Sequence, residues 1–157
     1  MKVNGRVKVQ FELDSSAQQG FKTEALWAET LGSNLFRLLN SPFFVFGVSA
    51  GDVVTAEEQR GILTFRNVAS RGGHSTYRIF LQDSYTIRSE EFLSHWQPIA
   101  ELGGSFENAN DHFVAADVPP SVDVFAVYRA LERGEHDEIW SFEEGHYQRN
   151  PPFVGQR

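Results

Sequence analysis

The chain is organised around one stretch, Pro42-Phe43-Phe44-Val45-Phe46-Gly47-Val48-Ser49-Ala50-Gly51-Asp52-Val53-Val54. Three phenylalanines within four residues make this stretch too apolar for a solvated loop, and two glycines interrupt it too often for a helix. A strand-like run at residues 35–39 precedes it, and Gly51-Asp52-Val53-Val54 begins another run of the same kind. We therefore interpret the stretch as a connection that plugs the end of a small β-barrel.

The segments on either side of this stretch predict short strands. Residues 7–13 alternate apolar and polar side chains without interruption, which is typical of a half-buried strand. Residues 57–61 form a polar connection that ends in glycine and suits a hairpin. The five predicted strands lie at residues 7–13, 23–29, 35–39, 52–56 and 62–68. Five short strands with close turns indicate a small, partly open barrel.

The pattern changes in the second half of the chain, where a first helix is predicted. Ser89 is a good N-cap, and apolar side chains recur behind it at helical spacing until Gly103 ends the helix. Pro98 lies inside this helix and has no N–H to donate, so we expect it to kink or split the helix near Ser94.

A second helix and four strands complete this half. The inward side of the second helix carries Val124, Val127, Tyr128 and Leu131, and Arg133-Gly134 closes it. The strands are predicted at residues 76–81, 106–109, 113–118 and 139–143. The order strand, helix, strand, strand, helix, strand is that of a ferredoxin-like βαββαβ unit. We therefore expect an α+β fold, with a five-stranded β-barrel-like lobe at residues 1–72, a ferredoxin-like lobe at 73–144 and a C-terminal tail at 145–157.

Composition and charge narrow the classes of function. Of the 157 residues 41% are hydrophobic, enough for a sizeable core, and the absence of cysteine excludes disulfides, Cys-ligated zinc and thiol catalysis. Residues 1–78 contain nine Lys and Arg against seven Asp and Glu, whereas residues 79–157 contain five against fourteen. This acidic half argues against nucleic acid as a partner and favours a basic protein. The alternative is an acidic surface that only keeps the protein soluble.

The sequence also bears on localisation. No segment approaches membrane-spanning length, and the first residues lack the apolar region of a signal peptide. We therefore expect a cytoplasmic protein without a membrane partner.

The ordered motifs of the chain resemble those of a bacterial family known as a domain of unknown function. The resemblance rests on Pro42-Phe43-Phe44…Gly47…Ser49…Gly51-Asp52-Val53-Val54 and on Gly73-His74-Ser75-Thr76…Arg78. It is supported by Trp27-Ala28-Glu29 and Val118-Pro119-Pro120…Val122-Asp123, and it covers nearly the whole chain. Ala50 departs from the family pattern, in which a larger, often aromatic residue is expected. Because the family has no established activity, the resemblance implies a bacterial cytoplasmic protein and no particular reaction.

The polar segment at residues 71–78 is the main candidate for a ligand site. Glycines let a ligand approach the backbone closely, and neighbouring amides with hydroxyl and guanidinium groups can hold an anion. The candidate ligand-binding residues are Arg71, His74, Ser75, Thr76 and Arg78. Among them, His74 could act as an acid or base near neutral pH. The alternative is that Gly72-Gly73 turns the chain between two lobes while the polar side chains satisfy local backbone groups.

Catalytic and cofactor motifs are not recognisable. A triad of Ser75, His74 and Asp52 is disfavoured, because adjacent residues of a strand point to opposite faces. The five histidines form no pair at metal-ligand spacing with a nearby carboxylate, so we predict no metal site. Neither the dinucleotide fingerprint nor the P-loop is present, so we predict no cofactor and favour a protein that is not an enzyme.

Acidic residues near the C-terminus are candidates for a partner surface. They are Glu132, Glu135, Asp137, Glu138 and Glu143, and the alternative is a solvated face. The phenylalanines at positions 43, 44 and 46 fill the core, wall a pocket or form a hydrophobic hot spot for binding, and core packing is the most frequent of these roles. We expect a non-enzymatic intracellular binding protein, of inhibitor or immunity type, that engages a basic protein through its acidic half. The alternative is a small-molecule or anion-binding module, with or without enzyme activity, built on the Gly-Gly-His-Ser-Thr segment.

Overall fold

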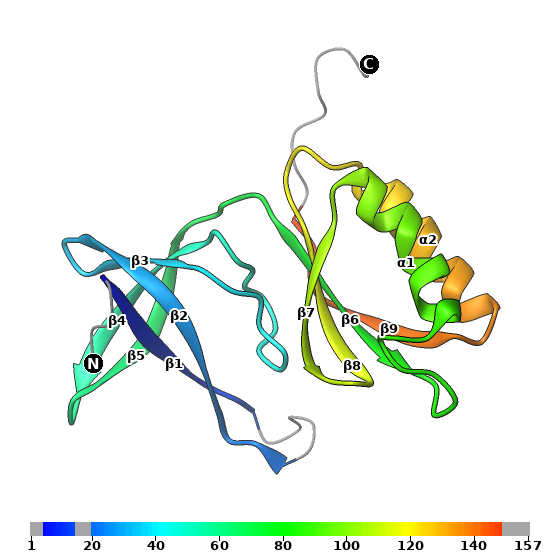
Figure 1. Ribbon diagram of the computed structural model, residues 1–157. Coiled ribbons are helices and arrows are strands. Elements are labelled where there is room, and N and C mark those ends of the chain that lie inside the picture. Colours follow the sequence, from blue (N-terminus) through cyan, green and yellow to red (C-terminus); the bar gives the residue numbers. More distant parts are fainter. Residues whose placement is uncertain (1–4, 15–19, 149–157) are drawn as a thin grey trace.

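The computed structural model describes residues 5–14 and 20–148, and in these ranges the protein is mixed α+β, with two sheets and two helices. Figure 1 shows the two sheets side by side, with both helices on the face of the second sheet that points away from the first. The α+β class predicted from the sequence is confirmed. No helix of the described ranges is long and apolar enough to cross a membrane.

The first sheet is a ring of five strands. They are β1 (Arg6–Glu12), β2 (Thr23–Gly32), β3 (Leu35–Leu38), β4 (Val53–Gln59) and β5 (Ile62–Ser70), hydrogen-bonded in this order. The ring closes where β1 pairs with β5 in parallel, Val9 opposite Leu63 and Gln10 opposite Thr64. Because side chains alternate along a strand, every second residue points inward, and these residues form the first core.

The β4–β5 turn is tighter than predicted. Residues 57–59 belong to β4, and only Arg60 and Gly61 connect it to β5. Both have positive φ, 54° and 80°, as in the two-residue type I′ turn, whose twist matches that of the flanking strands. The prediction of a five-residue connection was wrong because Glu57 and Glu58 are strand residues in the outer part of the hairpin, where polar side chains resemble those of a loop.

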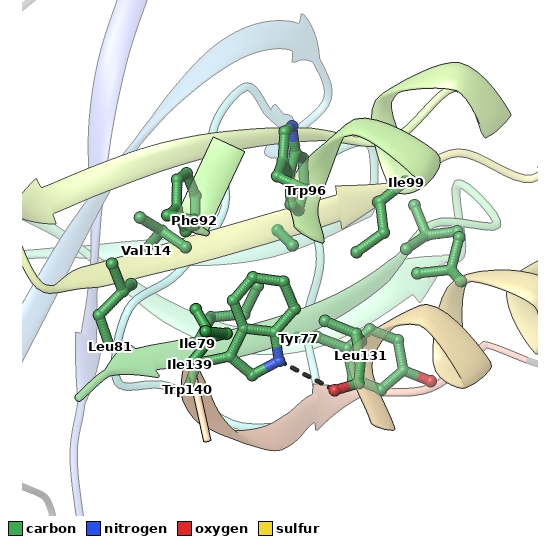
Figure 2. Close-up of a cluster of buried hydrophobic side chains, with 13 residues drawn as sticks. Tyr77, Ile79, Leu81, Phe92, Trp96, Ile99, Val114, Leu131, Ile139 and Trp140 are labelled. Atoms are coloured by element: carbon green, nitrogen blue, oxygen red, sulfur yellow. Dashed lines mark hydrogen bonds between the residues drawn. The ribbon is translucent and has the colours of Figure 1, made fainter. Parts of the chain in front are cut away.

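The second sheet has four antiparallel strands in the order β7-β8-β6-β9. They are β6 (Ser75–Leu81), β7 (Ser105–Asn110), β8 (Phe113–Val118) and β9 (Trp140–His146). One face is covered by α1 (Glu90–Leu102) and α2 (Val124–His136), and the second core lies between helices and sheet, as Figure 2 shows. Trp140 lies within it, and its Nε1 donates a 2.9 Å hydrogen bond to the carbonyl oxygen of Leu131. The predicted order of helices and strands agrees with the observed one.

Two predicted interruptions of the helices are not observed. α1 continues through Pro98, because burial of Phe92, Trp96 and Ile99 offsets the one backbone hydrogen bond that a proline removes. α2 continues past Gly134 to His136. A Cβ added to Gly134 would lie 2.2 Å from Cε2 of Trp140, so this glycine makes room for the indole and does not end the helix.

The β3–β4 loop (residues 39–52) lies between the two sheets in Figure 1. Val45 and Val48 are buried in the first core. The rings of Phe43 and Phe44 contact the ring of Phe113 in β8, at centroid distances of 5.5 Å and 5.9 Å. The loop therefore covers the first core and also joins the two sheets, a second role that its interpretation as a plug did not include.

The last strand extends beyond the predicted end of the second lobe. β9 includes Gly145 and His146, which the sequence analysis assigned to the tail. The extension is held by the β3–β4 loop, because the N–H of Gly47 donates a 3.0 Å hydrogen bond to the carbonyl oxygen of Gly145. Residues 149–157 of the predicted tail lie outside the described residues.

Candidate functional site

The polar segment predicted as a ligand site lies where the two sheets meet. Side chains along β6 alternate in direction, so Tyr77 points into the second core while Thr76 and Arg78 point towards the β3–β4 loop. By the same alternation Ser75 points away from the loop, and its Oγ accepts a 2.9 Å hydrogen bond from the backbone N–H of Gln148. Ser75 is therefore separated from the other predicted ligand-binding residues.

Arg78 is fully buried at the centre of this interface. Its Nη2 donates a hydrogen bond to the carbonyl oxygen of Val45, and its guanidinium carbon lies 4.6 Å from the ring centroid of Phe46. The backbone of Gly145 comes so close that an added Cβ would lie 3.0 Å from the same carbon. One side chain of β6 thus holds the β3–β4 loop and packs against β9.

The charge of Arg78 is an unusual feature of this interface. Burial lowers the pKa of the Arg78 guanidinium, while the charges of Glu143 and Glu24 act in the opposite direction. Among the described residues, Nε and Nη1 of Arg78 have no hydrogen-bond partner. A buried cation with two unused donors is a group that an anion or a carbonyl oxygen would stabilise.

Asp52 forms the second polar centre of the interface and is also fully buried. It accepts hydrogen bonds from the backbone N–H groups of Ser49 and Gly72, at 3.0 Å and 2.9 Å. Nη1 of Arg71 donates to Asp52 at 2.9 Å and to the carbonyl oxygen of Gly47 at 2.7 Å. The carboxylate and the guanidinium therefore tie the second half of the β3–β4 loop to the segment that enters β6.

His74 makes the third polar contact, at the start of β6. Its Nδ1 lies 2.9 Å from Oδ1 of Asp117, and this hydrogen bond raises the pKa of His74, opposed by burial. A Cβ added to Gly51 would lie 3.0 Å from Cδ2 of His74, and Gly51 has a φ of 89°. The close approach and the positive φ together explain glycine at this position. On the neighbouring strand, burial lowers the pKa of His146.

The structure brings four of the five predicted ligand-binding residues to one interface. Arg71, His74, Thr76 and Arg78 each contact the other sheet, the β3–β4 loop or a neighbouring strand, and Thr76 Oγ1 lies 2.6 Å from Oγ of Ser49. Ser49 and Asp117 also belong to this cluster, although the sequence does not predict them as site residues. Each lies more than 25 positions from its partner, so no local pattern identifies it.

The geometry bears on two further hypotheses. Nδ1 of His74 faces Asp117 whereas Oγ of Ser75 faces Gln148, so the serine–histidine pair considered in the sequence does not form. Within residues 5–14 and 20–148, no group of three or more His, Asp or Glu side chains is placed to hold a metal ion.

The predicted acidic residues do not form one surface. Glu132, Glu135 and Glu138 are exposed on α2 and in the turn that follows it. Asp137 lies beside them, where its carboxylate is 2.8 Å from Nε2 of His95, a contact that lowers the pKa of Asp137. Glu143 lies opposite Arg78 in the β6–β9 pairing and so points to the other face of the sheet.

Two exposed aromatic residues accompany these carboxylates. Phe125 is 64% exposed and Tyr128 is 39% exposed, both on α2. Tyr128, Glu132 and Glu135 follow Phe125 by three, seven and ten positions, which places all four residues on one side of the helix. We call these four residues, together with Glu138, the α2 face. The inward direction predicted for Tyr128 is only partly observed: its ring contacts the ring of Phe142 at a centroid distance of 5.4 Å, but the side chain remains 39% exposed.

Residues 24–142 match the family model described as "Domain of unknown function (DUF4265)". A solved structure described as that of a hypothetical protein from Neisseria gonorrhoeae is 18% identical, with a TM-score of 0.73, and the match covers 96% of this chain and 99% of that chain. At this identity the likeness shows a shared fold. The comparison with curated proteins found no match. The chain therefore belongs to the DUF4265 family, which confirms the resemblance to an uncharacterised family.

Proposed function

We propose that this DUF4265 protein is a non-enzymatic binding protein that engages a basic surface of a partner protein through its α2 face. The observation that carries the proposal is the combination of an exposed Phe125 and Tyr128 with exposed carboxylates on the same side of one helix. Aromatic residues at the centre of a patch supply most of the binding energy in protein interfaces, and surrounding charges select the partner.

The carboxylates of the α2 face are available for such a partner. Among the described residues, Glu132, Glu135 and Glu138 form no ion pair. Glu138 has a φ of 62°, so the chain turns sharply there and presents the side chain at the end of the helix. Exposed charges contribute little to folding stability, so these carboxylates are free of a requirement in folding and favour a role outside it.

The polar cluster at β6 supports a protein without catalysis. Its groups already have partners within the protein: Arg71 contacts Asp52 and Thr76 contacts Ser49, both in the β3–β4 loop, and His74 contacts Asp117 in β8. An inhibitor or immunity-type protein in the bacterial cytoplasm, with no nucleic acid or membrane as partner, is the setting that we propose for this binding.

A specific observation supports the second candidate function, an anion-binding module, which we now place at Arg71, His74, Thr76 and Arg78, without Ser75. Buried Nε and Nη1 of Arg78 have no partner among the described residues, and the same holds for Nε2 of His146. Titration with inorganic phosphate and with acetate, followed by backbone amide shifts at residues 45–47 and 76–78, tests this function. Saturable shifts that disappear in Arg78→Met would favour it over the binding-protein proposal.

We also propose a classification of the architecture. The closed pairing of β1 to β5 supports a small barrel, and the order β7-β8-β6-β9 with two helices on one face supports a ferredoxin-like lobe.

The experiment for the α2 face is native co-purification from the source bacterium followed by kinetics with the authentic partner. The variant Glu132→Lys/Glu135→Lys should abolish capture of the partner and slow association by at least about tenfold, because it reverses the local field. Association of the unmodified protein should also slow steeply between about 50 and 500 mM salt.

A matched control separates the α2 face from net charge. Glu58→Lys/Asp83→Lys changes the net charge equally at exposed positions outside this face. The control should bind as the unmodified protein does. Equal loss of association in both double variants would show that the effect is one of total charge and would remove the α2 face from the mechanism.

A further inference from the structure

A hollow of about 200 Å³ lies at the end of β1, on the side of the molecule built by the first sheet. It is lined by Glu12, Leu13, Asp14, Phe44, Val45 and Phe46. Two of these residues carry carboxylates and are exposed, and two carry phenyl rings. The hollow therefore combines negative charge with aromatic surface, which is the pairing that proteins use to bind organic cations.

The phenyl rings of this hollow are presented to solvent by a loop that is firmly held. Phe46 is 58% exposed, the second highest value among the large hydrophobic residues described. The carboxylate of Glu24 accepts hydrogen bonds from the backbone N–H groups of Phe43, Phe44 and Val45, at 2.6, 3.0 and 2.9 Å. Arg78 holds the carbonyl oxygen of Val45 from the other sheet. Such preorganised apolar exposure is typical of a binding site.

The electrostatics of the hollow favour a cation over an anion. Phe46 already lies against one cation, the guanidinium of Arg78. Glu12 and Asp14 place two carboxylates on the lining of the hollow, and the charges of Glu24 and Glu143 act on the buried Arg78. A basic side chain would place its methylene groups against the rings and its charge between the carboxylates.

We propose that this hollow is a binding site for one basic side chain, lysine or arginine, of a partner protein. The site goes beyond the function proposed above, since it lies on the other lobe and involves none of the residues of the α2 face. The volume of the hollow suits a single side chain, and the carboxylates that line it are complementary in charge to a cation.

The test is a titration followed by NMR amide shifts, with Nα-acetyl-lysine methylamide as the cationic probe. The matched neutral probe is the same compound acetylated on Nε. We expect saturable shifts at residues 12–14 and 44–47 with the cationic probe, at a Kd in the range of about 1–50 mM for so small a ligand. No shift up to about 50 mM, or equal shifts with the neutral probe, would overturn the proposal.

Variants assign the effect to the hollow. Glu12→Gln should weaken binding of the cationic probe at least about threefold, because it removes one of two carboxylates. Phe46→Leu should weaken it similarly while keeping an apolar side chain against Arg78, so it avoids the disturbance that Phe46→Ala would bring to the loop. Unchanged affinity in both variants would overturn the proposal.

Two controls complete the design. Glu58→Gln removes an exposed carboxylate of the same ring of strands outside the hollow and should leave the affinity unchanged. Glu132→Lys/Glu135→Lys should also leave it unchanged, so failure of the α2 face and failure of the hollow are distinguishable. If either control variant lost binding of the cationic probe, the shifts would be due to the overall charge of the protein, and the proposed site would be wrong.

Discussion

The guanidinium of Arg78 lies 4.6 Å from the ring centroid of Phe46, although one residue belongs to the second sheet and the other to a loop of the first. Arg78 is fully buried, whereas Phe46 is 58% exposed. A buried cation thus supports an exposed ring from beneath. The contact makes the conformation of the β3–β4 loop depend on a residue of the other sheet.

Replacement of Arg78 should therefore loosen the loop. Arg78→Met leaves the carbonyl oxygen of Val45 without its donor, which costs about 1–3 kcal/mol of unfolding free energy. Urea unfolding measures this cost, and hydrogen exchange at residues 44–47 shows where protection is lost. Arg88→Met, which breaks an exposed pair with Asp111, is the control and should change stability little. Equal effects of both changes would contradict the role of Arg78.

Glu24, which belongs to β2 of the first sheet, should contribute as much as Arg78 to holding the β3–β4 loop. Its carboxylate accepts three backbone hydrogen bonds from the β3–β4 loop, and Glu24→Ala leaves those N–H groups without their acceptor. We expect a loss of about 1–3 kcal/mol, measured by urea unfolding, and faster exchange at the three amides. Glu29→Ala, in an exposed pair with Arg37, is the matched control on the same strand. Unchanged unfolding free energy and unchanged exchange at the three amides in Glu24→Ala would contradict the role of Glu24 in holding the loop.

Gly134→Ala should destabilise the protein, although alanine is more favourable than glycine inside a helix by about 1 kcal/mol. The added Cβ would lie 2.2 Å from the ring of Trp140, so the indole has to move and its hydrogen bond to Leu131 is strained. We expect a net loss of about 1–3 kcal/mol by thermal or urea unfolding. Glu135→Ala, at the next and exposed position, should be neutral. A higher unfolding free energy in Gly134→Ala would show that α2 can move away from the indole of Trp140 without loss of stability.

The pair of His74 and Asp117 should make stability depend on pH. The hydrogen bond to Asp117 raises the pKa of His74 above its ordinary value of 6.5. The stabilisation is then complete below the unfolded pKa and is lost as the pH rises through the raised folded pKa. Unfolding free energies of the unmodified protein and Asp117→Asn should therefore differ more at about pH 6 than at about pH 8.5.

The comparison with Asp117→Asn is needed because another histidine titrates in the same range. Burial lowers the pKa of His146, so its contribution is lost as the pH falls, opposite to that of His74. His146 is present in both proteins, and its effect cancels in the difference. A difference that grows with pH, or that does not change, would contradict the assignment to His74.

Much of the fold follows from local patterns. The unbroken alternation at residues 7–13 predicts β1, and the apolar spacing between Ser89 and Gly103 predicts α1, because burial of one face imposes that period. Gly103 has a φ of 114°, the conformation expected of a glycine that ends a helix. Ser89 is at the predicted N-cap, but its Oγ accepts a hydrogen bond from the N–H of Thr86.

The candidate site is less predictable from the sequence than the fold is, because its contacts join residues that are distant in the sequence. A single arginine in an apolar strand indicates an exposed residue or a ligand-binding one, and nothing local shows that the β3–β4 loop will bury Arg78. Gly134 resembles a helix end until Trp140 is placed beside it. The acidic residues look continuous in sequence, yet the strand direction sends Glu143 to the opposite face from Glu132.

The β3–β4 loop has one more consequence, for how the protein unfolds. Its backbone is held by Glu24 from one sheet and by Arg78 from the other, and its phenylalanines rest on Phe113. Neither sheet can open without releasing this segment, so the two should lose structure in a single cooperative transition with matching exchange rates. The glycines at positions 72 and 73 then mark a change of direction within one folding unit. Each core is built from residues on its own side of these glycines, so a chain divided there should lose the contacts of the β3–β4 loop with Arg78 and Phe113 rather than members of either core.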